Sequence, residues 1–344
     1  MQRVTIKDVA RLAGVSVTTV SRALNNAPEI HGETRERVLR VCREQGYRAN
    51  LLARSLSSSR SSLLGLIVPD LANPFHAALA LNLELCAQAA GYQVMLCSSR
   101  PEEGQLETLF DLFFSQQADG VLLSSSGDGA YDLARRWQGD MPCVLLGACA
   151  PEDSPHRGNT VSVDNYAGGR MAAEYLHRLG HRDVAYLGLR EGSATHALRY
   201  RGFLSAAGDL GMKVTAIPSP YSVSTIEGGC HLARGFLSAP FSQTAVFAVS
   251  DSVALGLIQV ADELGVPVPQ RLSVLGFDNI EYAALPNIRL TTLSQNTPRL
   301  AQSALRLLLE LIEDGDGGGY VRRLITPSVI ERATCRRLPG PANT

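Results

Sequence analysis

Residues 1–25, MQRVTIKDVARLAGVSVTTVSRALN, contain two short amphipathic patterns joined by a glycine. Apolar side chains recur at helical spacing over residues 6–13, and Gly14 then ends the pattern. A second helical pattern covers residues 17–24. A helix, a tight glycine turn and a second helix together place one helix in the DNA major groove in many proteins. The start of the chain therefore predicts a helix-turn-helix head.

Side chains that can cap helices stand at the expected positions. Thr5 precedes the first helix and Asp8 follows three residues later, which is an acidic variant of the capping box. Ser16 precedes the second helix, where its hydroxyl can accept a hydrogen bond from a free amide. A third helix is expected over residues 33–45, with Gly46 ending it. We therefore expect three short helices around one small core.

The second helix has a polar side that suits contact with DNA. Arg22 can form a bidentate pair with guanine, and Thr18 or the Val17 methyl groups can touch base edges or a thymine methyl. Ser16 and Thr19, near the helix start, suit phosphate contacts. An alternative is that Arg22 is a solvated surface arginine, because isolated helix-turn-helix patterns give many false matches. The residues of the head that we expect to contact DNA are Thr5, Ser16, Val17, Thr18, Thr19, Ser21, Arg22 and Asn25.

The charge of the chain is unevenly distributed. The 344 residues carry a net charge of −1, with 32 basic and 33 acidic side chains. Residues 1–62 contain 11 Lys and Arg against 5 Asp and Glu, a net of +6. The remainder contains 21 basic against 28 acidic residues, a net of −7. A basic head on an acidic body indicates that only the head binds a polyanion.

The sequence also lacks several signals. No apolar run is long enough for a signal peptide or a membrane span, so we expect a cytoplasmic protein with no membrane partner. The seven cysteines form no CxxC pair and no metal-ligand spacing with histidine, which favours free thiols. There is no phosphate-binding loop, metalloprotease motif or nucleophile elbow. We therefore expect no cofactor, no metal and no catalytic activity.

From residue 63 onward, short apolar strands alternate with helical segments. The strand candidates include LLGLIVP, GVLLSS, VAYLGL and LSVLGF, and helices are expected between them. Apolar strands that alternate with helices indicate parallel sheets covered on both faces. There are more strands than one sheet usually holds, so we expect an α/β body of two similar lobes. Ligands of such folds bind at the carboxyl ends of strands, here in a cleft between the lobes.

The head motif VTIKDVARLAGVSVTTVSRALN, followed by GYRANLLARSL, resembles the LacI/GalR family of bacterial transcriptional regulators. The resemblance extends through the body and covers nearly the whole chain. It implies a helix-turn-helix head over residues 1–48, a hinge helix and linker over 49–62, and a two-lobed, periplasmic-binding-protein-like effector domain over 63–335. The effector domain would also hold the dimer together.

The segment NLLARSL, residues 50–56, matches the hinge helix of that family. In the family this helix folds when two copies meet over the operator centre, where leucines enter the minor groove and kink the duplex. By position, Leu56 would be the wedge and Ala53 would allow close approach to the groove floor, with Asn50 at the start of the helix. An alternative is that Leu56 is an ordinary linker residue.

The resemblance also implies an effector site. Asp70 and Phe75 lie in a segment that matches the family's NPF turn, and RYRGF, residues 199–203, matches its RxxGF motif, whose first arginine contacts the effector. Asp278 matches the family's effector-contacting acid. An arginine and an aspartate together suit the vicinal hydroxyls of a polyol, although an inter-lobe salt bridge is an alternative. Asp251 follows a strand and precedes a helix, so an N-cap is its favoured role, with effector contact as the other. The expected effector-site residues are Asp70, Phe75, Ser125, Arg199, Tyr221, Asp251, Asp278 and Gln295.

These observations predict a homodimeric, sequence-specific transcriptional regulator, expected to be a repressor. One small head has too little interface for useful specificity, so a pseudo-palindromic operator on double-stranded DNA is expected. The effector would be a small metabolite, a sugar or sugar acid, that alters operator affinity allosterically. Alternatives are a purine or sugar phosphate acting as corepressor, an α/β sugar-metabolising enzyme, and a transport-type binding protein.

Overall fold

The structure is a computed structural model. It describes residues 4–24, 27–47, 60–99, 105–124, 128–147, 158–190, 193–219, 225–315 and 319–339. The chain divides into two compact units, residues 1–62 and 63–344.

The first unit contains α1 (Ile6–Ala13), α2 (Val17–Leu24) and α3 (Gly32–Glu44). The capping box of α1 is present as predicted: the Thr5 backbone N–H donates to the Asp8 carboxylate at 3.0 Å, and the Thr5 hydroxyl accepts from the Asp8 N–H. Gly14 ends the helix in the left-handed conformation, with φ +65°. The Ser16 hydroxyl accepts from the Thr19 N–H at 3.0 Å, which confirms the cap of α2. Local sequence signals therefore determine both ends of the turn between α1 and α2.

The three helices enclose one small core. α3 ends close to the predicted position, and Gly46 follows it with φ +61°. The predicted hinge segment with Asn50, Ala53 and Leu56, and also Asn25, lie outside the described residues. The buried apolar residues of the head are Val9, Ala10, Ala13, Val20, Ala23, Val38, Val41 and Cys42.

The second unit contains two sheets, each of six strands within the described parts of the chain. The first sheet has the order β11-β5-β4-β3-β1-β2 and the second β12-β10-β9-β8-β6-β7. All neighbouring strands are parallel except β10 and β12, which pair antiparallel. This confirms the predicted α/β fold with two lobes. The strands are β1 (Leu63–Val68), β2 (Gln93–Ser98), β3 (Gly120–Ser124), β4 (Cys143–Leu146), β5 (Thr160–Val163), β6 (Asp183–Leu189), β7 (Lys213–Pro218), β8 (Ala245–Ala248), β9 (Ser273–Asp278), β10 (Thr291–Ser294), β11 (Arg322–Ile325) and β12 (Ser328–Ile330).

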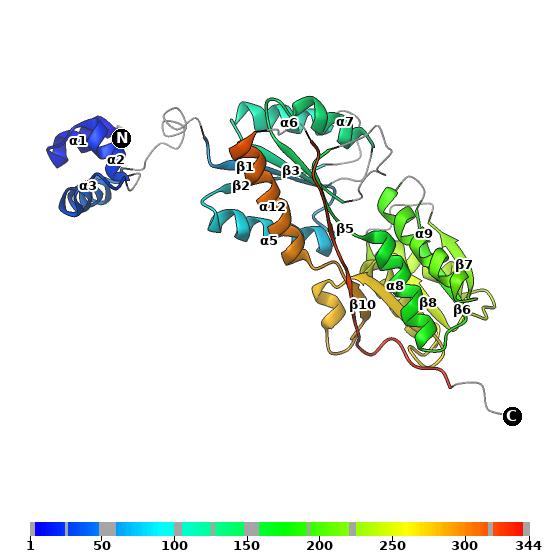
Figure 1. The fold of residues 1–344 in the computed structure, drawn as a ribbon. Helices are drawn as coiled ribbons and strands as arrows, with labels where there is room; N and C mark the ends of the chain where they lie inside the picture. The colour runs from blue at the N-terminus through cyan, green and yellow to red at the C-terminus, as the bar shows by residue number, and fades with distance from the viewer. Residues whose placement is uncertain are drawn as a thin grey trace. The chain divides into compact units, whose positions relative to one another are not determined.

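Helices cover both faces of each sheet (Figure 1). In β1, Leu66 packs into the same core as α5, whereas the next residue, Ile67, packs with Phe113 of α6. Successive side chains of a strand point to opposite faces, so both faces of this sheet are covered. The helices are α5 (Pro74–Ala89), α6 (Gln105–Ser115), α7 (Asp128–Trp137), α8 (Asn165–Arg178), α9 (Ala194–Asp209), α10 (Ile226–Leu237), α11 (Asp251–Glu263), the short η1 (Glu281–Ala284) and α12 (Thr297–Asp314).

The chain passes between the sheets after β5, after β10 and after β11. α12 returns to the first lobe, where it packs on α5, β3 and β5. Gln295 therefore lies at a crossing between the lobes, as predicted. In the described parts of the chain, none of the helices is both long and apolar enough to cross a membrane.

Candidate functional site

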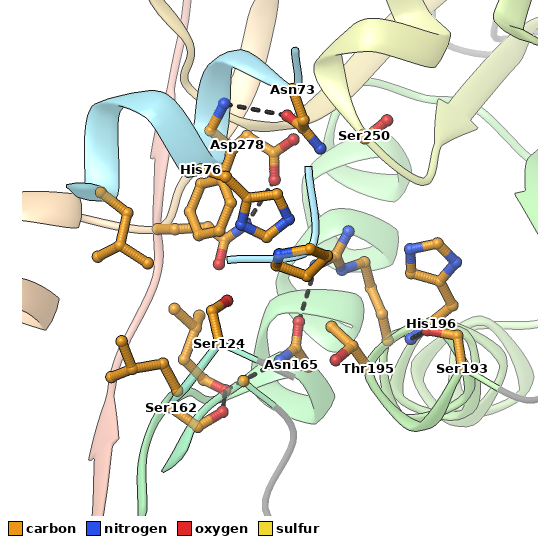
Figure 2. A pocket seen from close by; sticks show the side chains of 18 of the residues that line it. Asn73, His76, Ser124, Ser162, Asn165, Ser193, Thr195, His196, Ser250 and Asp278 are labelled. Atoms are coloured by element: carbon orange, nitrogen blue, oxygen red, sulfur yellow. Dashed lines mark hydrogen bonds between the residues drawn. The ribbon is translucent and has the colours of Figure 1, made fainter. Parts of the chain in front are cut away.

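A cavity of about 210 Å³ lies between the two lobes (Figure 2). The carboxyl ends of strands from both sheets meet there, because Ser124 ends β3, Asp278 ends β9 and Gln295 follows β10. This is where ligands bind in doubly wound α/β folds. The cavity is lined by Pro69, Asn73, Phe75, His76, Leu79, Ser124, Leu146, Gly147, Ser162, Val163, Asn165, Arg190, Ser193, Thr195, His196, Arg199, Ser250, Asp278, Gln295 and Leu300.

Arg199 of α9 is the central cation of the cavity and is 2% exposed. Its guanidinium donates to the Val249 carbonyl and, at 2.8 Å, to the Asn165 side-chain oxygen. The guanidinium carbon lies 3.4 Å from the ring centroid of Phe277. Burial lowers the pKa of Arg199, and the nearby Asp278 opposes this change. Nε of Arg199 is buried and has no hydrogen-bond partner among the described residues.

Asp278 faces the cavity from the end of β9 and is 8% exposed. Gln295 donates to its carboxylate at 2.5 Å. Burial raises the pKa of Asp278, the neighbouring Asp251 raises it further, and Arg199 lowers it. The backbone of Asp278 has φ +131°, a conformation that favours glycine. Residues held in such strained conformations gather at functional sites, where the surrounding structure enforces them.

Asp251 lies beneath the cavity wall and is fully buried. Its carboxylate accepts hydrogen bonds from the Ile280 N–H at 2.9 Å and the Thr292 hydroxyl at 2.6 Å. The expectation that Asp251 is a helix N-cap is wrong, because Ser250 caps α11 and accepts from the Val253 N–H. Asp251 is the first residue inside the helix, where its carboxylate joins α11 to the segments after β9 and in β10.

Two histidines line the cavity from different lobes, His76 on α5 and His196 on α9 (Figure 2). In both rings Nδ1 is buried and has no hydrogen-bond partner among the described residues. Burial lowers the pKa of His76 to about 4 and that of His196 to about 3, and Arg199 also lowers the latter. Both imidazoles are therefore neutral at pH 7 and can each donate and accept a hydrogen bond.

The structure brings together half of the residues predicted for the effector site. Phe75, Arg199, Asp278 and Gln295 line the cavity. Asp70 and Asp251 do not. The Asp70 carboxylate instead accepts from the Ala72 N–H at 2.8 Å, within its own turn. Ser125 and Tyr221 lie outside the described residues.

The sequence reasoning missed several lining residues, above all Asn165, His76 and His196. His76 directly follows the predicted Phe75, so its position beside the NPF turn was a usable signal. Asn165 and His196 offered no comparable signal, because their relation to the cavity depends on how α8 and α9 pack together. Ser193 was missed although its hydroxyl caps α9 by accepting from the His196 N–H.

In the head, α2 presents the side predicted to contact DNA. Val17, Thr18 and Arg22 are exposed, whereas Val20 and Ala23 are buried against α1 and α3. Ser16 is exposed at the start of α2, and its hydroxyl lies 2.8 Å from that of Thr19. The amphipathic pattern therefore leaves the arginine and the short polar side chains on one accessible surface.

Comparisons with known proteins agree with both units. Residues 5–50 match the family model "Bacterial regulatory proteins, lacI family", and residues 173–335 match "Periplasmic binding protein-like domain". The HTH-type transcriptional repressor CytR of Escherichia coli K12 is 33% identical over 97% of each chain. The chain belongs to the lacI family. This lacI-family member is thus a DNA-binding transcriptional regulator, and its relatives are named as regulators rather than enzymes.

Solved structures of lacI-family proteins share the fold. The lac repressor dimer bound to operator and the anti-inducer ONPF superposes with a TM-score of 0.86 at 24% identity, over 97% of this chain and all of that one. The transcriptional regulator CelR in complex with cellobiose gives a TM-score of 0.69 at 28% identity, over 96% of this chain and all of that one.

Proposed function

We propose that this lacI-family regulator is a cytoplasmic repressor whose operator affinity is set by a small sugar bound between the two lobes of residues 63–335. The observation that carries this proposal is the cavity between the lobes, with Arg199 and Asp278 on its walls. In this proposal residues 1–48 form the DNA-binding domain. Residues 49–62 form the hinge through which ligand binding in the cavity alters operator affinity.

The chemistry of the walls suits a polyol. Asp278 and Gln295 offer acceptors and donors, and Asn165 offers an amide beside Arg199. Phe75 provides an apolar surface for the CH face of a sugar ring. The cavity of about 210 Å³ is smaller than the roughly 300–1,000 Å³ of drug-sized sites, which favours a ligand of monosaccharide size. The cellobiose complex of CelR supports the sugar class.

Operator binding requires two copies of the chain in this proposal. A single head offers too small an interface for the specificity that a regulator needs, whereas two heads read two half-sites of a pseudo-palindrome. Thr5, Ser16, Val17, Thr18, Thr19, Ser21, Arg22 and Asn25 would contact the major groove and the phosphates, with Asn50, Ala53 and Leu56 in the minor groove. The lac repressor structure contains a dimer on its operator.

A thermal-shift screen tests the ligand class. The purified protein is heated with neutral pentoses and hexoses, cellobiose, the matching aldonic acids, sugar phosphates and purines. A ligand that binds only the folded state raises Tm, and the increase grows with the logarithm of its concentration once that exceeds Kd. We expect a sugar or aldonate to raise Tm in the wild type and not in Asp278→Ala. Stabilisation by purines alone would contradict the proposed class, as would no stabilisation by any compound.

A further inference from the structure

We propose that His76 of one lobe and His196 of the other form a pair of imidazoles that selects an uncharged sugar, each ring binding one of its hydroxyl groups. The proposal rests on the proposed function of the cavity and names the form of sugar that the cavity accepts. Its basis is the pair of buried ring nitrogens that have no partner among the described residues.

The first step concerns the hydrogen-bonding state of the two rings. A buried polar atom that lacks a partner costs about 1–3 kcal/mol, so such atoms are retained where something else supplies the partner. Both Nδ1 atoms belong to residues that line the cavity. The ring of Phe75 packs edge-on against that of His76 at 5.3 Å, and the Asp70 carboxylate acts on the same imidazole through its charge. A ligand seated against both rings would supply the missing partner for both nitrogens.

The second step concerns charge. Two arginines line the cavity: Arg199, whose pKa is lowered by burial and raised by the nearby carboxylates Asp278 and Asp251, and Arg190, whose charge acts on His196. Two donor groups of Arg199 are also bonded to Val249 and Asn165. A ligand carboxylate would have to compete with these groups and with Asp278. A hydroxyl avoids this competition, because it can either donate to a neutral ring nitrogen or accept from its N–H, as the tautomer of that ring requires.

The third step concerns the position of the two rings. His76 belongs to α5 of the first lobe and His196 to α9 of the second, and both are labelled in Figure 2 among the residues that line the cavity. A ligand that bonds to both rings joins the lobes. Binding of its hydroxyls would therefore favour closure of the two lobes. Lobe closure is the motion through which a ligand in this cleft can change operator affinity.

The test uses the full-length protein with four variants. His76→Phe and His196→Phe keep a flat ring but remove its hydrogen bonds, whereas His196→Asn restores a donor and an acceptor near the position of Nδ1. His177→Phe, a half-buried residue of α8 outside the cavity, is the matched control. For each protein we would measure Tm without ligand and Kd by calorimetry, using the neutral sugar that stabilises the wild type most and its aldonate.

We expect each cavity Phe variant to bind the neutral sugar about 3- to 10-fold more weakly, as the loss of one hydrogen bond predicts. The Tm without ligand should stay constant or rise, because an unpartnered buried nitrogen has been removed. A merely structural histidine would instead lower that Tm. His196→Asn should recover most of the affinity, and His177→Phe should change neither quantity.

Three results would overturn the inference. The first is unchanged sugar affinity in both cavity Phe variants. The second is stabilisation of the wild type by aldonates or sugar phosphates but not by neutral sugars. That result would still be consistent with a regulator controlled by a small ligand, but the ligand would be charged. The third is stabilisation by no compound of the panel, which contradicts the proposed function itself and the imidazole pair with it.

Discussion

At the scale of single residues, the buried carboxylate of Asp278 lowers the stability of the folded protein, and we propose that it is retained because it binds the ligand. Burial and the adjacent Asp251 disfavour its charged form, and the strained φ of +131° adds a further cost. A hydroxyl-bearing ligand would supply hydrogen bonds to a group that the unliganded protein satisfies only in part. We therefore expect Asp278 to lower the stability of the empty protein and to raise that of the ligand-bound protein.

We predict that Asp278→Asn stabilises the unliganded protein at pH 8. The pKa of Asp278 is raised from 3.8 to about 7 in the folded chain. Between these values the folded protein holds a proton that the unfolded chain has lost, so this group's contribution to stability falls as pH rises through the window. The Tm difference between variant and wild type should be largest at pH 8 and should shrink toward pH 4.

Thermal melts of both proteins from pH 4 to pH 8 provide the measurement. Comparison with the variant removes the contribution of titrating groups that do not interact with Asp278, whereas Asp251, which raises the pKa of Asp278, titrates differently in the two proteins. His76 and His196 act in the opposite direction. For these histidines the folded pKa is lowered to about 4 and about 3, so stability is lost as pH falls below 6.5. A variant less stable than the wild type at pH 8 would contradict the account of Asp278.

At the scale of elements, two helices meet closely enough to require glycine. A Cβ on Gly202 of α9 would lie 2.0 Å from the Tyr166 carbonyl oxygen of α8, and one on Gly169 of α8 would lie 2.0 Å from the Arg199 carbonyl oxygen. Arg199 stands one turn before Gly202 on the same helix. The contact between α8 and α9 therefore also positions the central cation of the cavity.

Gly202→Ala is expected to lower the free energy of unfolding by about 1–3 kcal/mol, because the helices must separate. It should also weaken sugar binding, since α9 carries Arg199 and His196. Gly208→Ala is the control on the same helix, because nothing lies within 4 Å of its added Cβ. Alanine there should be neutral or stabilising by up to about 1 kcal/mol. Equal effects of the two substitutions in chemical denaturation would refute the close-packing argument.

In the head, the exposed face of α2 is expected to read the operator. Arg22→Ala should reduce discrimination between operator and random DNA by roughly 1–3 kcal/mol, the value of one bidentate contact with guanine. Arg43→Ala, an exposed arginine of α3, is the matched control and should leave the discrimination unchanged. Competition binding at fixed salt measures both. Full discrimination in the Arg22 variant would exclude α2 as the reading helix.

Local sequence patterns predicted the helix ends and the lobes, but not the contacts between distant segments. Thr5, Gly14 and Ser16 act through neighbours within a few residues, so the ends of α1 and α2 followed directly from the sequence. The alternation of apolar strands with helices, and the large number of those strands, likewise indicated the two lobes. Asp251 was misassigned as a cap, because its partners Ile280 and Thr292 lie 29 and 41 residues away. His196 was missed for the same reason: a cavity depends on tertiary packing that periodicity does not describe.

At the scale of the whole molecule, the proposed dimer would place two heads on one operator, so that two weak contacts together give specific binding. We predict that DNA selected from a random pool by this protein contains two half-sites related by approximate two-fold symmetry. DNA with one half-site scrambled should bind about 100-fold more weakly or worse, because the second contact is lost. Gel-shift titrations of the two duplexes test this. Equal affinity for both would contradict operator binding by a dimer.

The central claim is that a sugar between the lobes sets operator affinity, and an operator titration tests it most directly. Fluorescence anisotropy would measure operator Kd with and without the stabilising sugar, for the wild type and for Asp278→Asn. We predict a change of about 5- to 150-fold in the wild type, the range of a coupling energy of 1–3 kcal/mol, and little change in the variant. A sugar that stabilises the wild type but leaves its operator Kd unchanged would contradict the claim.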